Sequence, residues 1–97
     1  MLDIRYGEDR HVLLAGRLDA AQAAAAQAFL DEVSPPCVID ASGLEYISSA
    51  GLGVLLKTHK RLMAAGSGIR LINVNPHVLD VFRYSGMDKL FSVTCGT

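Results

Sequence analysis

The chain has 97 residues and a net charge of −1 at pH 7. This length suits one domain with a single core, and the near-neutral charge gives no electrostatic reason to expect binding to nucleic acid or to an anionic membrane. No apolar run approaches the roughly 20 residues that cross a bilayer, and the first residues do not form a signal peptide. We therefore expect a cytoplasmic protein without direct membrane insertion.

The N-terminal segment predicts an antiparallel hairpin followed by a helix. Residues 2–6 alternate apolar and polar side chains, residues 7–10 have turn composition, and residues 11–15 form the returning strand. Gly16 is expected to end that strand, and Asp19 to cap a helix over about residues 20–33. The helix begins with a run of alanines, which favours helical backbone but buries little area. Its first half should therefore fray most easily.

The central stretch, residues 37–56, organises the rest of the chain. Residues 37–39 form an apolar run typical of a buried strand, residues 41–46 read as a polar loop, and helical periodicity begins after Ser48-Ser49. The apolar stripe of this second helix consists of Leu52, Leu55, Leu56, Leu62 and Met63. Because serine is a common N-cap, local chemistry favours Ser48 as the cap and Ser49 as a first-turn residue. The free N–H groups and the dipole of a helix start would also accommodate an anion there.

The second helix is expected to end near Ala65. Lys57, Lys60 and Arg61 share the face opposite the leucines, and such a stripe either is solvated or docks an acidic partner. His59 lies on the apolar stripe, where we expect it to be packed or half-buried.

The C-terminal part predicts a strand over residues 69–74, a third helix and a last strand over residues 91–95. Asn75-Pro76 has the composition of a helix start, and Ser85-Gly86 that of a helix end. Helices that alternate with strands predict an α/β fold with a mainly parallel sheet, to which the hairpin adds an antiparallel edge. Cys37 and Cys95 lack metal-ligand spacing, so we expect buried, reduced thiols and neither a metal nor a cofactor.

Several segments in this order resemble STAS domains, in particular bacterial anti-sigma factor antagonists. They are residues 14–19 (LAGRLD), 38–43 (VIDASG), 46–53 (YISSAGLG), 71–78 (LINVNPHV) and 85–87 (SGM). The resemblance implies one STAS domain over residues 1–97, with the α/β architecture inferred above. Members of the family usually continue with one more helix after the last strand, so we expect that C-terminal helix to be missing here.

The resemblance implies a phosphorylation-switched binding protein and not an enzyme. In these antagonists, the serine matching Ser49 is phosphorylated by an anti-sigma factor with serine kinase activity, and a metal-dependent serine/threonine phosphatase reverses the modification. The unphosphorylated form sequesters the anti-sigma factor and thereby releases a sigma factor. Many antagonists carry an aspartate where this chain has Ser48 and a hydroxyl residue where it has Ala50. Ser48 therefore stays an alternative phosphoacceptor.

The family's precedent also implies a set of partner-contacting residues around the helix start. These are Asp19, Asp40, Ser42, Tyr46, Ser48, Ser49 and Gly51. We expect Asp19 and Asp40 to end strands at the sheet edge that carries Ser49. By local chemistry, Asp19 is a helix cap, and Asp40 is a loop anchor or a contact residue with equal weight.

Two enzyme classes and one further binding role are alternatives to this assignment. A hydrolase would need Gly-x-Ser-x-Gly at the serine, but Ile47 stands at the first glycine position for Ser49. The pair Gly51 and Gly53 lacks the third glycine of a dinucleotide fingerprint and is expected to allow close approach of helix and sheet. The alternative that stays open is a constitutive docking subunit of a lipid-transport ATPase complex or of another signalling assembly.

Overall fold

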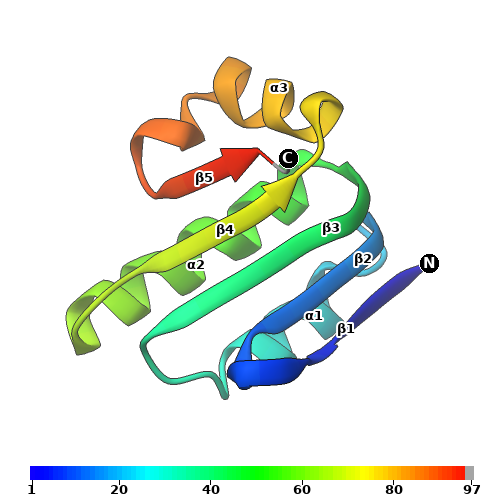
Figure 1. The fold of residues 1–97 in the computed structure, drawn as a ribbon. Helices are drawn as coiled ribbons and strands as arrows, with labels where there is room; N and C mark the ends of the chain where they lie inside the picture. Colours follow the sequence, from blue (N-terminus) through cyan, green and yellow to red (C-terminus); the bar gives the residue numbers. More distant parts are fainter. Residues whose placement is uncertain (96–97) are drawn as a thin grey trace.

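The computed structural model describes residues 1–95, which form a five-stranded sheet and three α-helices (Figure 1). The strands are β1 (Leu2–Tyr6), β2 (Val12–Leu18), β3 (Cys37–Ile47), β4 (Ile69–Val74) and β5 (Ser92–Cys95), in that spatial order. The helices are α1 (Ala23–Leu30), α2 (Ser49–Ala65) and α3 (Pro76–Ser85), with short 3-10 turns at Glu8–Arg10 and Met87–Lys89. β1 pairs antiparallel with β2, and all other neighbours are parallel. The predicted α/β fold with an antiparallel hairpin at one edge is confirmed.

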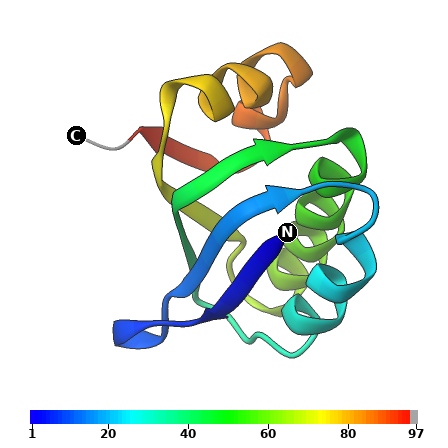
Figure 2. The same ribbon diagram turned by 90° about the vertical axis from the view of Figure 1, so that its right-hand side faces the viewer.

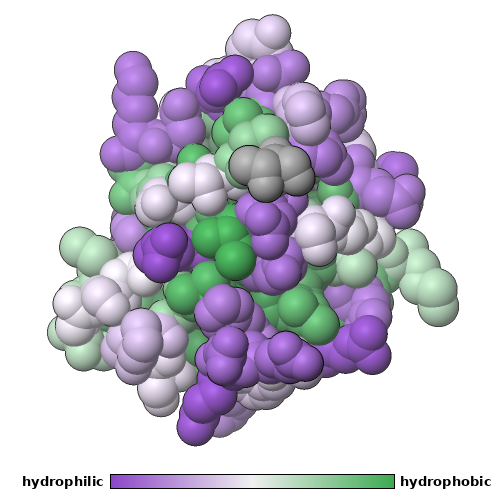
Figure 3. Space-filling model, in the orientation of Figure 1, coloured by the Kyte–Doolittle hydropathy of each residue, from purple (hydrophilic) through white to green (hydrophobic). Residues whose placement is uncertain are grey.

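Helices α1 and α2 lie together on one face of the sheet, as Figure 2 shows. The strand residues that share this face, such as Val12, Ile39 and Leu71, are buried. Among residues 1–95, no helix covers the opposite face, which faces the viewer in Figure 3. This face carries the half-buried side chains of Leu13 and Ile72. We call this the open face. No helix follows β5 in the described part of the chain, and Gly96 and Thr97 lie outside it.

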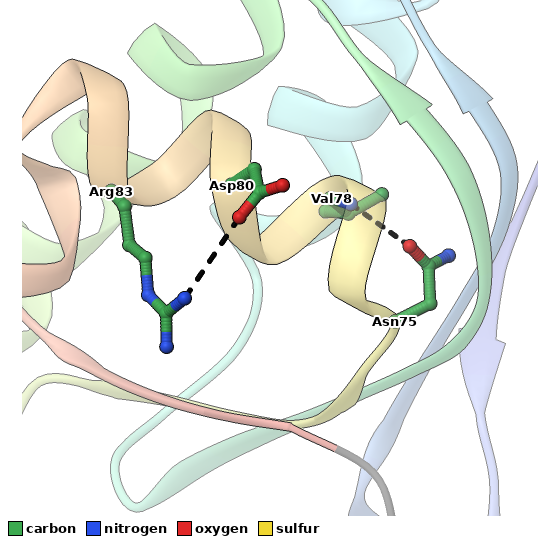
Figure 4. A network of polar contacts seen from close by, with 4 residues as sticks. All are labelled: Asn75, Val78, Asp80 and Arg83. Atoms are coloured by element: carbon green, nitrogen blue, oxygen red, sulfur yellow. Dashed lines mark hydrogen bonds and ion pairs between the residues drawn. The ribbon is translucent and has the colours of Figure 1, made fainter.

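Helix α3 packs at one end of the sheet, against β3 and β5. Phe82 of α3 is fully buried, and its ring meets that of Phe91 edge-on, with 6.1 Å between the centroids. Asn75 caps the helix as predicted, because its Oδ1 accepts a hydrogen bond from the N–H of Val78 at 2.8 Å (Figure 4). The Asn75 amide also donates to the carbonyl oxygen of Leu44 at 2.8 Å, which joins the start of α3 to β3.

Strand β3 is longer than predicted. The sequence predicts a loop over residues 41–46, whereas these residues continue β3 to Ile47 by pairing with β2. The prediction that Gly16 ends the preceding strand is also wrong, because β2 continues to Leu18. Gly16 instead occupies a left-handed conformation, with φ of +89°, directly beside the backbone oxygen of Met1. The pairing of two irregular strands therefore overrides their turn-like composition.

Helix α1 is shorter than predicted, since it begins at Ala23 and ends at Leu30. Asp19 caps the turn that precedes it: the Asp19 carboxylate accepts a hydrogen bond from the N–H of Gln22 at 3.2 Å. Ala26 and Leu30 are the buried residues of α1, so its alanine-rich first half contributes little apolar burial, as expected.

Arg61 joins α2 to the end of α1. The sequence assigns it to a basic stripe, but its Nη2 donates to the carbonyl oxygens of Leu30 at 2.8 Å and of Val33 at 2.7 Å. The last carbonyls of a helix lack partners within it, and the guanidinium supplies one here. Lys57 and Lys60 of the predicted stripe remain exposed.

The buried side of α2 differs in detail from the predicted stripe. Leu52, Leu55 and Leu62 are buried, but Met63 is 55% exposed, and Val54 and Thr58 are buried instead. A helix that packs on both a sheet and a neighbouring helix buries a wider arc than one stripe, which accounts for the difference.

His59 is half-buried, as predicted. Its Nδ1 accepts a hydrogen bond from the N–H of Ile69 at 3.0 Å, and its ring lies 5.0 Å from that of Phe91.

Only one of the two cysteines follows the prediction. Cys37 is buried, and burial raises the pKa of its thiol to about 11 against the opposing charge of Arg61. Cys95 is exposed, because β5 forms an edge of the sheet.

Candidate functional site

The start of α2 is fixed by Ser48, which is the N-cap that the sequence predicts. Its hydroxyl accepts a hydrogen bond from the N–H of Gly51 at 3.3 Å and donates to the carbonyl oxygen of Leu18 at 3.4 Å. The backbone N–H of Ser48 donates to the same carbonyl at 3.0 Å. Ser48 therefore ties the first turn of α2 to the end of β2.

Ser49 has no comparable structural role. It is the first residue of α2 and is exposed, and within residues 1–95 its hydroxyl makes no hydrogen bond. No histidine or carboxylate pairs with it there, so it lacks the adjacent base that activates a nucleophilic serine. Ser49 therefore presents an exposed hydroxyl at the start of α2.

The two glycines of α2 differ in what surrounds them. A Cβ on Gly51 would lie 2.7 Å from the backbone oxygen of Leu18 and 2.8 Å from Cγ1 of Ile47, so close packing on the sheet requires glycine. A Cβ on Gly53 would meet nothing within 4 Å. The expectation of close helix–sheet approach is therefore correct for Gly51 and wrong for Gly53. Gly53 lies four residues after Ser49, hence on the same exposed face of the helix.

Asp19 and Tyr46 lie at the same edge of the sheet as the start of α2. Leu18 pairs with Ile47 in the β2–β3 ladder, so Asp19 follows β2 where Ser48 follows β3. Tyr46 pairs with Arg17, and the guanidinium carbon of Arg17 lies 4.2 Å from the centre of the Tyr46 ring. Glycine spacing could have singled out Gly53 from the sequence, but Arg17 had no local signal, because its partner is 29 residues away.

Asp40 and Ser42 do not lie at this edge. Asp40 pairs with Leu13 and Ile72 in the middle of the sheet, and at about 3.3 Å per residue it is roughly 20 Å along β3 from Ile47. The predicted shared edge is therefore wrong for Asp40, because β3 does not end there. The N–H of Ser42 donates to the Asp40 carboxylate at 3.0 Å, so Asp40 is a local backbone anchor.

The electrostatic environment of Asp40 keeps it ionised at neutral pH. Burial raises the pKa of its carboxyl, but hydrogen bonds from Ser42 and Asn73 and the nearby His11 outweigh that effect and hold the pKa below its usual value.

Within residues 1–95, no three histidine, cysteine or acidic side chains come close enough together to bind a metal ion. None of the helices described has the length and apolar character needed to cross a membrane.

The chain is similar to one family profile and to one named relative. A family profile described as "Mlab, STAS domain" matches residues 4–93. BtrV of Bordetella bronchiseptica, which is named as an anti-sigma factor antagonist, is 43% identical over 56 residues. This match covers 58% of the present chain and 48% of BtrV, which is about half of the relative's length.

Solved structures show the same arrangement of elements. A crystal structure of an anti-sigma factor antagonist from Mycobacterium paratuberculosis has a TM-score of 0.80 and 26% identity, covering 97% of this chain and 84% of that one. The Bacillus cell fate determinant SpoIIAA in its phosphorylated form has a TM-score of 0.66 and 19% identity, covering 96% and 90%. The likeness to SpoIIAA concerns the fold alone.

Proposed function

Because this chain belongs to the STAS domain family, we propose that it is an anti-sigma factor antagonist whose binding is switched by phosphorylation of Ser49. The unphosphorylated chain sequesters an anti-sigma factor with serine kinase activity and thereby releases a sigma factor. A metal-dependent serine/threonine phosphatase restores the binding form. The chain acts in the cytoplasm as one STAS domain, residues 1–97, without catalysis of its own. The names of BtrV and of the mycobacterial structure support this role.

The observation that carries the proposal is that two adjacent serines, Ser48 and Ser49, have different structural roles. Ser48 caps the helix through its hydroxyl, whereas Ser49 is exposed and its hydroxyl has no hydrogen bond within residues 1–95. A phosphoryl group on Ser49 would therefore break no hydrogen bond of the Ser49 side chain. Its added charge of about −1.5 to −2 lies near the positive end of the α2 dipole. The modified domain should stay folded.

The same phosphoryl group would block a partner that packs on this edge. A partner covering Ser49 would have to remove water from the added charge, which costs several kcal/mol in the absence of a cation. Gly53, one turn after Ser49, has no side chain and has open space around its Cβ position. A partner can therefore approach the helix backbone closely there. Binding and phosphorylation thus exclude each other on this surface.

Asp19, Tyr46 and Ser49 form the direct contact set of the proposed surface. Ser48 and Gly51 act indirectly, because Ser48 fixes the first turn of α2 and Gly51 lets that turn pack on the sheet. The contacts proposed for Asp40 and Ser42 are withdrawn from this surface, since both lie in the middle of the sheet.

The test is a pull-down from native cytoplasm with wild type, Ser49→Ala and Ser49→Asp, followed by intact-mass analysis and phosphate mapping. We expect wild type and Ser49→Ala to capture an anti-sigma kinase, Ser49→Asp to capture at least tenfold less, and phosphate to map to Ser49. Ser67→Asp, which adds the same charge at an exposed loop serine, should behave as wild type. Ser48→Ala should still be phosphorylated at Ser49.

Two results would overturn the proposal. Equal capture of a transport ATPase by all variants, without any phosphate, would leave a constitutive docking subunit. Phosphate on Ser48 that disappears in Ser48→Ala would move the switch to the capping residue.

A further inference from the structure

The open face carries an apolar strip along its middle. Leu13, Asp40 and Ile72 form one row across β2, β3 and β4, and Val38 lies in the neighbouring row beside Arg70. The three apolar side chains of these rows are half-buried. Figure 3 shows green patches over the middle of the sheet, bordered by purple side chains.

This exposure is unusual for a sheet of this type. Parallel sheets occur almost always with both faces covered, because each face buries apolar residues. Here β2, β3, β4 and β5 are joined by parallel ladders, yet among residues 1–95 the helices α1 and α2 cover one face only (Figure 2). An apolar centre with a polar border is the usual anatomy of a protein interface.

Asp40 places a negative charge in the centre of this strip, between Leu13 and Ile72. Its hydrogen bond from the N–H of Ser42, 3.0 Å long, fixes the carboxylate in place. A cleft of about 450 Å³ opens beside it, under the turn that joins β1 and β2, and Glu8 and Asp9 also line this cleft. The cleft is large enough for a lysine or arginine side chain.

Within residues 1–95, no arginine or lysine lines this cleft. Arg5 is 3.7 Å from Asp3, Arg17 lies over Tyr46, and Arg70 belongs to the next row of the sheet. His11 lines the cleft, and its proximity helps to hold the pKa of the Asp40 carboxyl below its usual value. The centre of the strip therefore complements a positive charge.

Charge also decides between the two simplest occupants. A second copy packed face to face about a two-fold axis through the strip would bring two Asp40 carboxylates together in a desolvated interface, which is unfavourable. A helix is the element that ordinarily covers a sheet face. We propose that the open face docks an amphipathic helix of a partner protein that places apolar side chains on Leu13, Val38 and Ile72 and one lysine or arginine beside Asp40.

The test uses four synthetic helical peptides that are identical except for one central residue of the apolar face: Arg, Lys, Gln or Glu. Binding to isotopically labelled protein is followed by amide chemical shifts. We expect the Arg and Lys peptides to shift the amides of residues 12–15, 37–41 and 70–73 and to bind at least fivefold more tightly than the Glu peptide. In Asp40→Asn this preference should fall below twofold.

Asp40→Asn keeps an oxygen that can accept from Ser42, so the variant should stay folded. Asp88→Asn removes an equal charge from the turn after α3 and should retain the full preference. The inference is overturned if no peptide binds at 1 mM, if the Glu peptide binds as well as the Arg peptide, or if the shifts map elsewhere. It is also overturned if the free protein dimerises in sedimentation experiments through these same amides.

Discussion

Helices α2 and α3 begin with the same kind of cap, but they differ in the residue that follows it. Each helix begins with a side-chain cap that bonds the N–H of the residue three positions on, and each cap also bonds a strand carbonyl. The next residue is Pro76 in α3, which has a fixed φ angle, no backbone N–H and no polar side chain. In α2 it is Ser49, an exposed hydroxyl that the fold does not use.

A capped helix start does not by itself mark a site. At the start of α3, the Asn75 side chain makes two structural hydrogen bonds, to Leu44 and to Val78, and both are 2.8 Å long. At the start of α2, the Ser48 hydroxyl makes the corresponding hydrogen bonds, to Gly51 at 3.3 Å and to Leu18 at 3.4 Å. The two helix starts differ in two respects. Only α2 has a hydroxyl, that of Ser49, without a hydrogen bond within residues 1–95, and only α2 has a glycine, Gly53, one turn further along the same face.

The largest expected effect comes from the third helical position, which is Gly51 in α2 and Val78 in α3. Gly51→Ala places a methyl group 2.7 to 2.8 Å from Leu18 and Ile47. Overpacking of this kind should lower the free energy of unfolding by about 2–3 kcal/mol, as measured by urea titration. A change below about 0.5 kcal/mol would show that the α2 start adjusts freely.

The caps themselves should rank in the order of their hydrogen bonds. Asn75→Ala removes a cap and leaves the carbonyl of Leu44 without its donor, so we expect a loss of about 2 kcal/mol. Ser48→Ala should lose about 1 kcal/mol, because its bonds are longer and the Ser48 N–H still holds Leu18. Asn75→Asp keeps the cap alone and should fall between wild type and Asn75→Ala. Equal losses at the two caps would contradict the comparison.

Gly53→Ala should separate stability from binding. Alanine is favoured over glycine in a helix interior by about 1 kcal/mol, and Gly53 has open space around its Cβ position. We expect the midpoint of thermal unfolding to rise while affinity for the anti-sigma factor falls. An equal gain in stability with unchanged affinity would remove Gly53 from the proposed surface.

The smallest effect on stability is expected at Ser49. Ser49→Ala should change the free energy of unfolding by less than about 0.5 kcal/mol, because its exposed side chain makes no contact that the fold uses. Chemical denaturation of this variant beside Ser48→Ala gives the most direct contrast between the two serines. A loss at Ser49 as large as that at Ser48 would assign both residues to the cap.

Local signals in the sequence were sufficient for the order of the elements and for both caps. Ser48 and Asn75 are each followed by a change of periodicity, and the polar residue accepts from a nearby N–H in either case. Such contacts span three residues, so the sequence displays both partners together. Asp19 follows this rule only in part: its carboxylate accepts from the nearby N–H of Gln22, but it caps the turn before α1 and not the helix itself.

The errors involve partners that are far apart in the sequence. Residues 41–46 have turn composition, but their pairing with β2 makes them a strand, and the position predicted for Asp40 was wrong for that reason. The sequence places Arg61 in an outward-facing basic stripe and gives no sign of its acceptors, Leu30 and Val33, which lie 31 and 28 residues earlier. No periodicity within α2 reveals such a contact.

The bond between Arg61 and the end of α1 also sets where that helix opens. The guanidinium bonds the last carbonyl of α1, that of Leu30, and the Leu30 side chain anchors the same end in the core. The first turns have only Ala26 fully buried. Local opening of α1 should therefore start at Ala23 and stop before Leu30, giving amide hydrogen exchange that slows along the helix. The fast-exchanging end is the one next to Asp19, so a partner that docks there would meet the most adaptable segment of the sheet's helical cover.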